Sequence, residues 1–430
     1  MTATRPHVTA EPKRPPDIGP WLALIAVGMA LALLPFAHTP SRAYLLAFAL
    51  VAIASLASAR ISRSARWRTI VYWPTLVLLG AFAVSILVSE LRPLLIHRFW
   101  AMPVLALLMP VVQVACWRSA TRRGVFILIL CTVLIVALDL ILQRWTGWSL
   151  GGRVLEGPGN VDQSGSLGNP NDLAAMTILL PIGLLALPQG RPVFHLAGVV
   201  ATLACTNLAA VLTTSRQVLI GWCLGGLSGV VTPGRGSFPK GALLTLAVLV
   251  LGVFTLQFIG VPWLSTEGFR EEFEMTVESG VGTERSMQYR YAWWLFTERP
   301  WLGIGAGGFG EYWSLGIAEG WTWNETPLPS VAMPWVHNLE LEVLCETGII
   351  GAAAFVLCIG HAILGCVRGV RRGPEASTLA RAVLGSGLVF LVIGLVDLSF
   401  IKDWVRVVFW LGLGLAAAAA TSENNLPEKS

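Results

Sequence analysis

The sequence is dominated by apolar runs that are long enough to cross a membrane. Hydrophobic residues make up 55% of the 430 residues and charged residues only 13%, whereas a helix that crosses a hydrocarbon core of about 30 Å needs about 20 apolar residues. Twelve such runs lie at about residues 20–37, 43–59, 70–89, 99–117, 125–143, 172–188, 193–213, 217–231, 241–259, 337–365, 382–398 and 404–420. Continuous runs favour helices over the alternating segments of a transmembrane β-barrel. The chain is therefore predicted to be an all-α polytopic membrane protein with about twelve transmembrane helices.

The basic residues predict the orientation of these helices. They gather in short connections such as 60–68, 118–123, 235–240 and 368–381, and the positive-inside rule places such connections in the cytoplasm. The net charge of +5 therefore reports topology and does not indicate nucleic-acid binding. The resulting division is a disordered cytoplasmic tail (1–18), nine transmembrane helices (19–259), a periplasmic loop (260–336), three further helices (337–420) and a cytoplasmic tail (421–430).

The large loop contains a segment with the pattern of an amphipathic helix. In residues 283–298, Met287, Tyr291 and Leu295 recur at helical spacing. Arg285 and Arg290 lie in the same segment, about 140° apart around a helix, so that both need not face one ligand. One of these two arginines is a candidate for binding an anion, and the other can be structural.

Arg216 is a second candidate for anion binding. It follows Thr213, Thr214 and Ser215 between two apolar runs that have almost no loop between them. A guanidinium at the membrane edge is costly without a partner, and its planar donors suit phosphate oxygens. Arg216 together with Arg285 or Arg290 could therefore bind a pyrophosphate.

His337 lies where the polar loop returns to apolar sequence. Asn338 can orient it, Glu340 follows at i+3, and an imidazole can transfer protons near neutral pH. A lone His at a helix start is more often a cap or a core hydrogen-bonding group. The neighbouring polar residues favour a catalytic role, whereas Glu346 is predicted to serve helix packing.

Several other features have structural interpretations. The segment NPNDLA (169–174) is predicted to cap the following helix, and the glycines of 303–310 are predicted to form a flexible turn, because no strand precedes them. Asp139 and Asp397 lie in apolar runs, where a carboxylate is a functional candidate by default, although Asp397 can simply pair with Lys402. The seven cysteines lie in or beside apolar runs and indicate neither a disulfide framework nor a metal site.

The motifs taken together resemble the O-antigen ligase and polymerase superfamily, most closely the lipopolysaccharide O-antigen ligases. The resemblance rests on NPNDLA, on TTSRQ (213–217), on an Arg upstream of PWLGIGAGGF (300–309) and on HNLELEVLCETGIIG (337–351). It covers nearly the whole chain and implies about a dozen transmembrane helices with one large periplasmic loop. Arg285 matches the family's loop arginine best by its distance to Pro300, but Tyr289 replaces the tryptophan that usually follows it, so Arg290 stays a candidate.

The resemblance also implies an activity. Such proteins move a glycan from an undecaprenyl-pyrophosphate carrier to the lipid A-core at the periplasmic face of the bacterial inner membrane, with inversion and without metal or cofactor. Carried over to this chain, His337 would be catalytic, and Arg216, Arg285 or Arg290, and Asn338 would bind substrate. A polymerase that extends the glycan on its carrier, or a ligase that delivers glycan to protein, is the alternative within the superfamily.

A secondary transporter is the alternative from another class. Transporters with twelve helices usually contain internal repeats and bind substrate near the membrane midplane. This sequence shows no such symmetry, and a transporter gives no role to the long loop beside His337.

Overall fold

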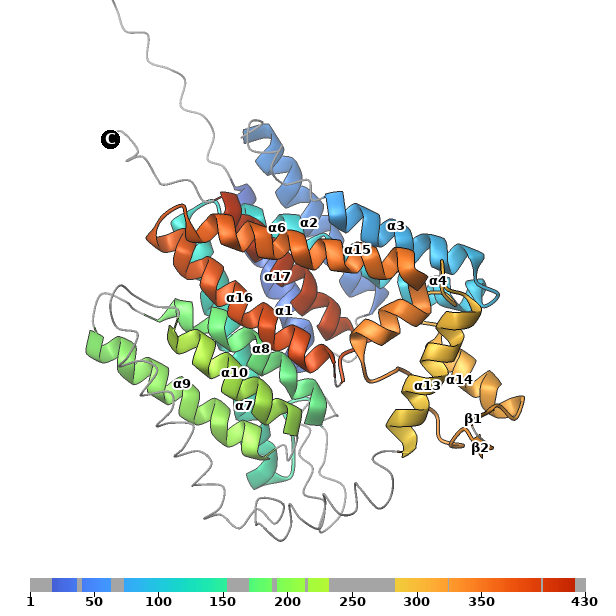
Figure 1. The fold of residues 1–430 in the computed structure, drawn as a ribbon. Helices are drawn as coiled ribbons and strands as arrows, with labels where there is room; N and C mark the ends of the chain where they lie inside the picture. The colour runs from blue at the N-terminus through green and yellow to red at the C-terminus, as the bar shows by residue number, and fades with distance from the viewer. Residues whose placement is uncertain are drawn as a thin grey trace, which may run out of the picture.

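The protein is a bundle of packed helices with a smaller helical unit at one end. The structure, a computed structural model, describes residues 18–36, 41–62, 73–152, 170–187, 192–212, 216–231, 283–323, 325–395 and 397–421. The predicted tails at 1–18 and 421–430 and the apolar run at 241–259 lie wholly or almost wholly outside these residues. Figure 1 shows α13, α14 and a short hairpin together beside the bundle, and we refer to this side as the α13 end.

The first half of the described chain is helical. Its helices are α1 (Gly19–Phe36), α2 (Arg42–Ser62), α3 (Trp73–Val88), α4 (Arg92–Phe99), α5 (Ala101–Ala106), α6 (Leu108–Ala115), α7 (Ser119–Thr146), η3 (Pro170–Leu173), α8 (Ala174–Gly183), η4 (Leu184–Ala186), α9 (Pro192–Leu212) and α10 (Arg216–Val231). The run predicted at 99–117 is not one straight helix. Pro103 and Pro110 lack the backbone N–H that would continue the helix, and the chain accordingly divides into α4, α5 and α6.

The second half contains the unit at the α13 end and three long helices. Its elements are α13 (Thr283–Glu298), α14 (Phe309–Ala318), the antiparallel pair β1 (Thr322–Trp323) and β2 (Thr326–Pro327), α15 (Leu339–Val370), α16 (Pro374–Gly394) and α17 (Asp403–Thr421). The helix predicted over 283–298 is present with these bounds, and Met287, Tyr291 and Leu295 are buried while Arg285 and Arg290 are exposed.

Seven described helices are long and apolar enough to cross a membrane, if α4 to α6 are taken as one span. Three of the predicted runs form shorter apolar helices, Gly19–Leu34, Trp73–Val88 and Ala175–Ala186. The described residues therefore confirm a mostly helical protein with several helices suited to spanning a membrane, while the count of twelve stays a prediction.

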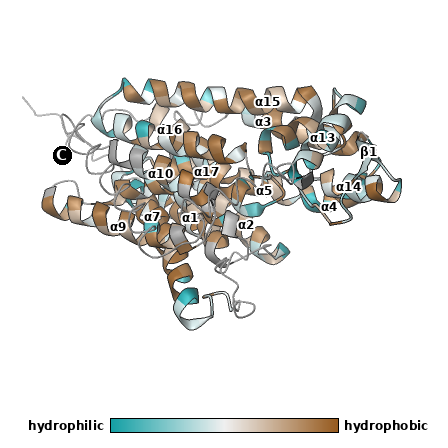
Figure 2. Cartoon of the chain, turned by 60° about the horizontal axis from the view of Figure 1, so that its bottom comes forward, coloured by the Kyte–Doolittle hydropathy of each residue, from teal (hydrophilic) through white to brown (hydrophobic). Residues whose placement is uncertain are grey.

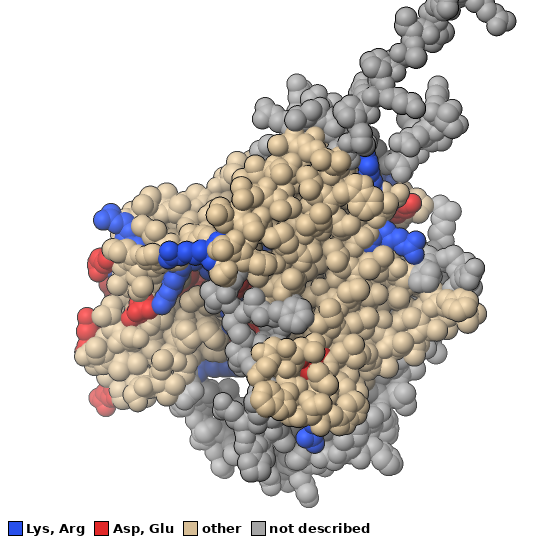
Figure 3. Space-filling view, turned by 180° about the vertical axis from the view of Figure 1, so that it is seen from behind, with Lys and Arg blue, Asp and Glu red and all other residues tan. Residues whose placement is uncertain are grey.

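Lipid exposure explains the outer surface of the bundle. Large apolar side chains such as Leu50, Val356 and Leu388 are more than half exposed, which is expected when the solvent is hydrocarbon and not water. Figure 2 shows the apolar colouring continuing over the outside of the helices, and the view in Figure 3 shows a broad uncharged area with charged side chains mainly toward its rim.

Helix α17 forms the centre of the bundle. It packs against α6, α15 and α16, and all its residues from Trp404 to Ala419 except Gly412 are buried. The described part of the chain also has a second, separate apolar cluster at the α13 end, built around Tyr291, Phe309 and Trp313. The candidate site lies where these two cores meet.

Candidate functional site

His337 precedes helix α15 and does not belong to it. Its φ of 59° is unusual for a residue with a side chain, and strain of this kind often occurs at functional sites. Asn338 is the N-cap residue: its Oδ1 accepts a hydrogen bond from Leu341 N at 2.8 Å, and its Nδ2 donates to Leu395 O at 3.1 Å. The amide of Asn338 thus joins the start of α15 to the end of α16, and the predicted contact of Asn338 with substrate stays a prediction.

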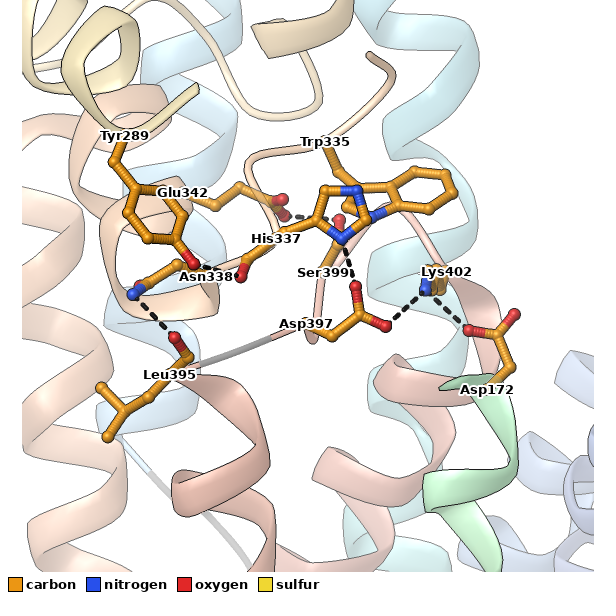
Figure 4. Close-up of polar contacts among 10 residues, drawn as sticks. All are labelled: Asp172, Tyr289, Trp335, His337, Asn338, Glu342, Leu395, Asp397, Ser399 and Lys402. Carbon is orange, nitrogen blue, oxygen red and sulfur yellow. Dashed lines mark hydrogen bonds and ion pairs between the residues drawn. The ribbon is translucent and has the colours of Figure 1, made fainter. Parts of the chain in front are cut away.

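The imidazole of His337 contacts the carboxylate of Asp397. Nδ1 of His337 bonds to Oδ1 of Asp397, whose side chain is only 2% exposed (Figure 4). Asp397 lies in the break between α16 and α17, beyond the end of the helix, and not inside an apolar helical run as the sequence suggested. A carboxylate at Nδ1 holds the proton on that nitrogen and leaves Nε2 as the proton acceptor.

The indole of Trp335 lies next to the same imidazole. Its Nε1 is 3.2 Å from His337 Nδ1, and the two rings are 5.4 Å apart with an angle of 53° between them. Nδ1 cannot both accept a hydrogen from Trp335 and donate one to Asp397. We assign the proton of Nδ1 to the bond with Asp397, because an ionised acceptor forms the stronger hydrogen bond.

Lys402 connects this pair to a distant part of the chain. Its Nζ is 2.6 Å from Oδ1 of Asp172, 3.8 Å from Oδ2 of Asp397 and 4.4 Å from the centre of the Trp335 ring (Figure 4). The predicted pairing of Asp397 with Lys402 is therefore present. The side chains of Lys402 and Asp172 are 7% and 13% exposed, so water screens this ion pair only weakly.

Asp172 belongs to the segment NPNDLA, which was predicted only to cap the following helix. It lies in η3, directly before α8, and no cap by its side chain is present there. Its carboxylate is 13% exposed and pairs with the ammonium of Lys402 at 2.6 Å. A nearby cation of this kind favours the ionised form of a buried carboxylate.

Helix α13 reaches the site through Tyr289. The hydroxyl of Tyr289 donates a hydrogen bond to the backbone carbonyl of His337 at 3.2 Å. Burial is the main reason that the pKa of Tyr289 is raised; Asp397 raises it further, and Arg285 lowers it, so the hydroxyl stays protonated near neutral pH. The residue that departs from the family's usual tryptophan therefore contacts the backbone of the candidate catalytic residue.

The two loop arginines have different surroundings. Arg285 is exposed one turn before Tyr289, on the side of α13 that approaches the site. Arg290 is also exposed, but its guanidinium lies over the ring of Trp323 in β1, 5.5 Å from the ring centre. The structure thus brings Arg285 toward His337 and Arg290 toward the hairpin.

Arg216 is the first residue of α10, and only its backbone belongs to the described structure. A Cβ added to Gly221 would meet the side chain of Thr177, and one added to Gly225, one turn later, would meet the carbonyl of Thr177 and the ring of Pro181, so α10 and α8 run parallel. Since α8 begins directly after Asp172, Arg216 begins its helix at the end of the bundle where Asp172 and Lys402 lie. TTSRQ is otherwise outside the description, because residues 213–215 are not described.

Two buried glutamates of α15 hold the segments that surround the site. Glu342 accepts hydrogen bonds from Ser399 Oγ at 2.7 Å and from Phe400 N at 2.9 Å, and it thereby fixes the turn that carries Asp397 and Lys402. Glu346 accepts from Gly307 N at 2.7 Å and from Phe309 N at 3.1 Å. Glu346 was predicted to serve helix packing, and its described contacts are with the glycine-rich turn.

That turn has a defined geometry and is not the loose connection that its glycines suggested. Ile304 N donates to Cys345 O at 3.1 Å, and Gly305 N donates to Glu346 O at 2.8 Å. The backbone of PWLGIGAGGF therefore lies directly against α15. This contact fixes the unit at the α13 end relative to the bundle.

Two other acidic candidates lie against other segments of the chain. A carboxylate oxygen of Glu340 lies 2.8 Å from the position that a Cβ of Gly394 would occupy, so this side chain faces α16 and not His337, contrary to the interpretation from sequence. Oδ1 of Asp139 accepts a hydrogen bond from Leu150 N at 2.5 Å, which closes the chain after α7.

The sequence alone missed the roles of Trp335 and Tyr289. The detectable signal was the high density of aromatic residues in a polar segment, because an indole or phenol needs a polar partner when it is partly buried. Within the described ranges, no group of three or more His, Cys, Asp or Glu side chains could hold a metal ion. The described contacts join the pair of His337 and Asp397 to the buried pair of Lys402 and Asp172.

A comparison with protein families agrees with these motifs. The family model described as O-antigen ligase matches residues 197–356, a region that includes TTSRQ, α13, the glycine-rich turn and His337. NPNDLA lies outside the matched region. No curated protein matches the chain.

Proposed function

We propose that the chain belongs to the O-antigen ligase superfamily, whose family model matches residues 197–356, and that it transfers O-antigen polysaccharide from undecaprenyl pyrophosphate to the lipid A-core at the periplasmic face of the bacterial inner membrane. The observation that carries this proposal is the contact between His337 and the buried Asp397, at the place where α13 meets the bundle. A general base fixed in this way suits the deprotonation of a sugar hydroxyl.

The proposed reaction uses His337 as the base and Asp397 as its partner. Nε2 of His337 takes the proton of the acceptor hydroxyl while the oxygen of that hydroxyl attacks the anomeric carbon of the donor. The bond from this carbon to the pyrophosphate oxygen breaks, and undecaprenyl pyrophosphate leaves from the opposite face, so the anomeric configuration inverts. Asp397 stabilises the imidazolium that forms, as a carboxylate does in a catalytic triad.

The leaving pyrophosphate needs positive charge. We assign this role to Arg216 and Arg285, because guanidinium groups can contact phosphate oxygens through two parallel hydrogen bonds. Arg285 is supported by its exposure one turn from Tyr289, and Arg216 by the position of its backbone at the same end of the bundle. Arg290 has an aromatic partner in Trp323 and is assigned a structural role.

The test is His337→Ala in membranes that contain the carrier-linked glycan and the lipid A-core. We expect transfer to fall by on the order of a hundredfold or more, which is the range for losing a general base. His361→Ala, in the same helix α15, is the matched control and should keep normal transfer. Near-normal turnover by His337→Ala would contradict the proposal, as would a loss of activity on chelation that Mg²⁺ or Mn²⁺ restores.

A polymerase that extends the glycan on its carrier is equally compatible with the family match. Disruption of the gene followed by gel analysis of lipopolysaccharide distinguishes the two. Carrier-linked polymer with a bare core supports a ligase, whereas a core that bears a single repeat supports a polymerase. A transporter would not require the arginines at the α13 end for binding a pyrophosphate carrier.

A further inference from the structure

We propose that Lys402 is a positioning residue for this reaction, which holds Asp397 in place as the carboxylate that orients His337, and that Asp172 in turn holds Lys402. This inference rests on the proposed function, because it assigns His337 as the base. It also gives a role to NPNDLA, which the mechanism above does not use.

The burial of Asp397 is the first reason. Its side chain is 2% exposed, and a carboxylate removed from water is strongly disfavoured without a cation nearby. Lys402 supplies that cation at 3.8 Å, at the carboxylate oxygen that does not contact His337 (Figure 4). Each oxygen of Asp397 therefore faces one basic side chain, so the carboxylate is fixed in orientation as well as in charge.

The surroundings of Lys402 exclude direct binding of the phosphate by this residue. Its ammonium is bonded to Asp172 at 2.6 Å, lies over the ring of Trp335 and is only 7% exposed. These contacts occupy the sides from which a substrate could approach. Lys402 therefore acts through Asp397, whereas Arg285 is exposed and can reach a ligand.

Asp172 determines where the ammonium lies. The separation of 230 residues along the chain means that this one ion pair joins the start of α8 to the start of α17. The distance from Lys402 Nζ to the carboxylate of Asp172, 2.6 Å, is shorter than its distance to the carboxylate of Asp397, 3.8 Å. Without Asp172, Lys402 could move onto Asp397 and compete with His337 for that carboxylate.

The experiment is a double-mutant cycle between Lys402 and His337, measured with a radiolabelled donor in the intact protein. Lys402→Met should lower kcat by about 10- to 100-fold, the range seen when the outer partners that orient metal-bound histidines are removed, and it should leave the donor KM within about twofold. Lys402→Arg should recover part of the lost rate. In a His337→Ala background, Lys402→Met should cost less than about threefold, because residues that act as one unit are not additive.

Other results would overturn the inference. An equal loss in both backgrounds would mean that Lys402 acts independently of His337, and a raised donor KM at unchanged kcat would mean that it binds the phosphate. Arg122→Met is the matched control: it removes a 2.5 Å ion pair with Glu375 between α7 and α16, away from the α13 end, and should leave kcat unchanged.

Two further variants distinguish a folding defect of Lys402→Met, a wrong role for Lys402 and a wrong proposed function from one another. Asp172→Asn keeps the positive charge of Lys402 and should also lower kcat, by less than Lys402→Met, so it tests the same chain of contacts if Lys402→Met does not accumulate. Normal turnover by both Lys402→Met and Asp172→Asn beside an inactive His337→Ala would overturn only the role of Lys402. Normal turnover by His337→Ala would overturn the proposed function itself.

Discussion

Gly348 is predicted to be the glycine of α15 that tolerates substitution least. It interrupts the helix with φ 64° and ψ −170°, a conformation that is essentially restricted to glycine. A Cβ added there would lie 2.3 Å from both the carbonyl carbon and the oxygen of Trp301 and 2.5 Å from Leu302 N. These are backbone atoms that cannot rotate away, so Gly348→Ala must separate α15 from the glycine-rich turn.

The magnitude follows from the contacts that this separation breaks. Forcing a side chain into such a conformation costs about 1–3 kcal/mol. The hydrogen bonds from Ile349 N to Pro300 O, 2.8 Å, and from Ile350 N to Trp301 O, 3.4 Å, flank the clash, and each is worth about 1 kcal/mol. We therefore expect Gly348→Ala to destabilise the protein by about 3–5 kcal/mol, most of it at the junction with the α13 end.

Thermal unfolding in detergent, followed by the fluorescence of the tryptophans, measures this effect. Gly360→Ala is the matched control in the same helix, because nothing lies within 4 Å of an added Cβ there. That variant should match the wild type or be up to about 1 kcal/mol more stable, since Ala favours a helix over Gly. If Gly348→Ala unfolded at the same temperature as Gly360→Ala, the close approach of the two backbones would be refuted.

Two further predictions concern the anion site and the topology. Arg216→Ala should abolish transfer and Arg216→Lys should restore little, because an ammonium cannot form two parallel bonds to phosphate. Arg285→Ala should be more damaging than Arg290→Ala in the same membrane assay. Equal activity of these two variants would contradict the assignment of the loop arginines. A reporter tag near Gly320 should be periplasmic while tags at both termini are cytoplasmic, and a cytoplasmic signal from Gly320 would overturn the topology together with the site.

The tertiary structure changes how two of the predicted residues are understood. Asn338 was predicted to orient His337, and Glu340 was predicted to lie on the same helix face at i+3, but His337 lies outside α15 in a left-handed conformation. The side chain of Asn338 therefore caps the helix, and Glu340 turns to α16. The i+3 spacing places two residues on one face only within a continuous helix. The positive φ of His337 keeps this residue out of the helix, so the spacing no longer predicts their contact.

The sequence by itself determined the class of the protein and much of its local structure. Long apolar runs and helical periodicity depend on neighbours within one or two turns, which is why the class and the bounds of α13 could be predicted. The pairing of side chains depends instead on how the helices pack. Asp397 lies 60 residues from His337, and Lys402 lies 230 residues from Asp172. Only the packing of α8, α15 and α17 brings these residues together. A buried charge needs a partner of opposite charge, and that partner can come from any part of the chain that packs beside it.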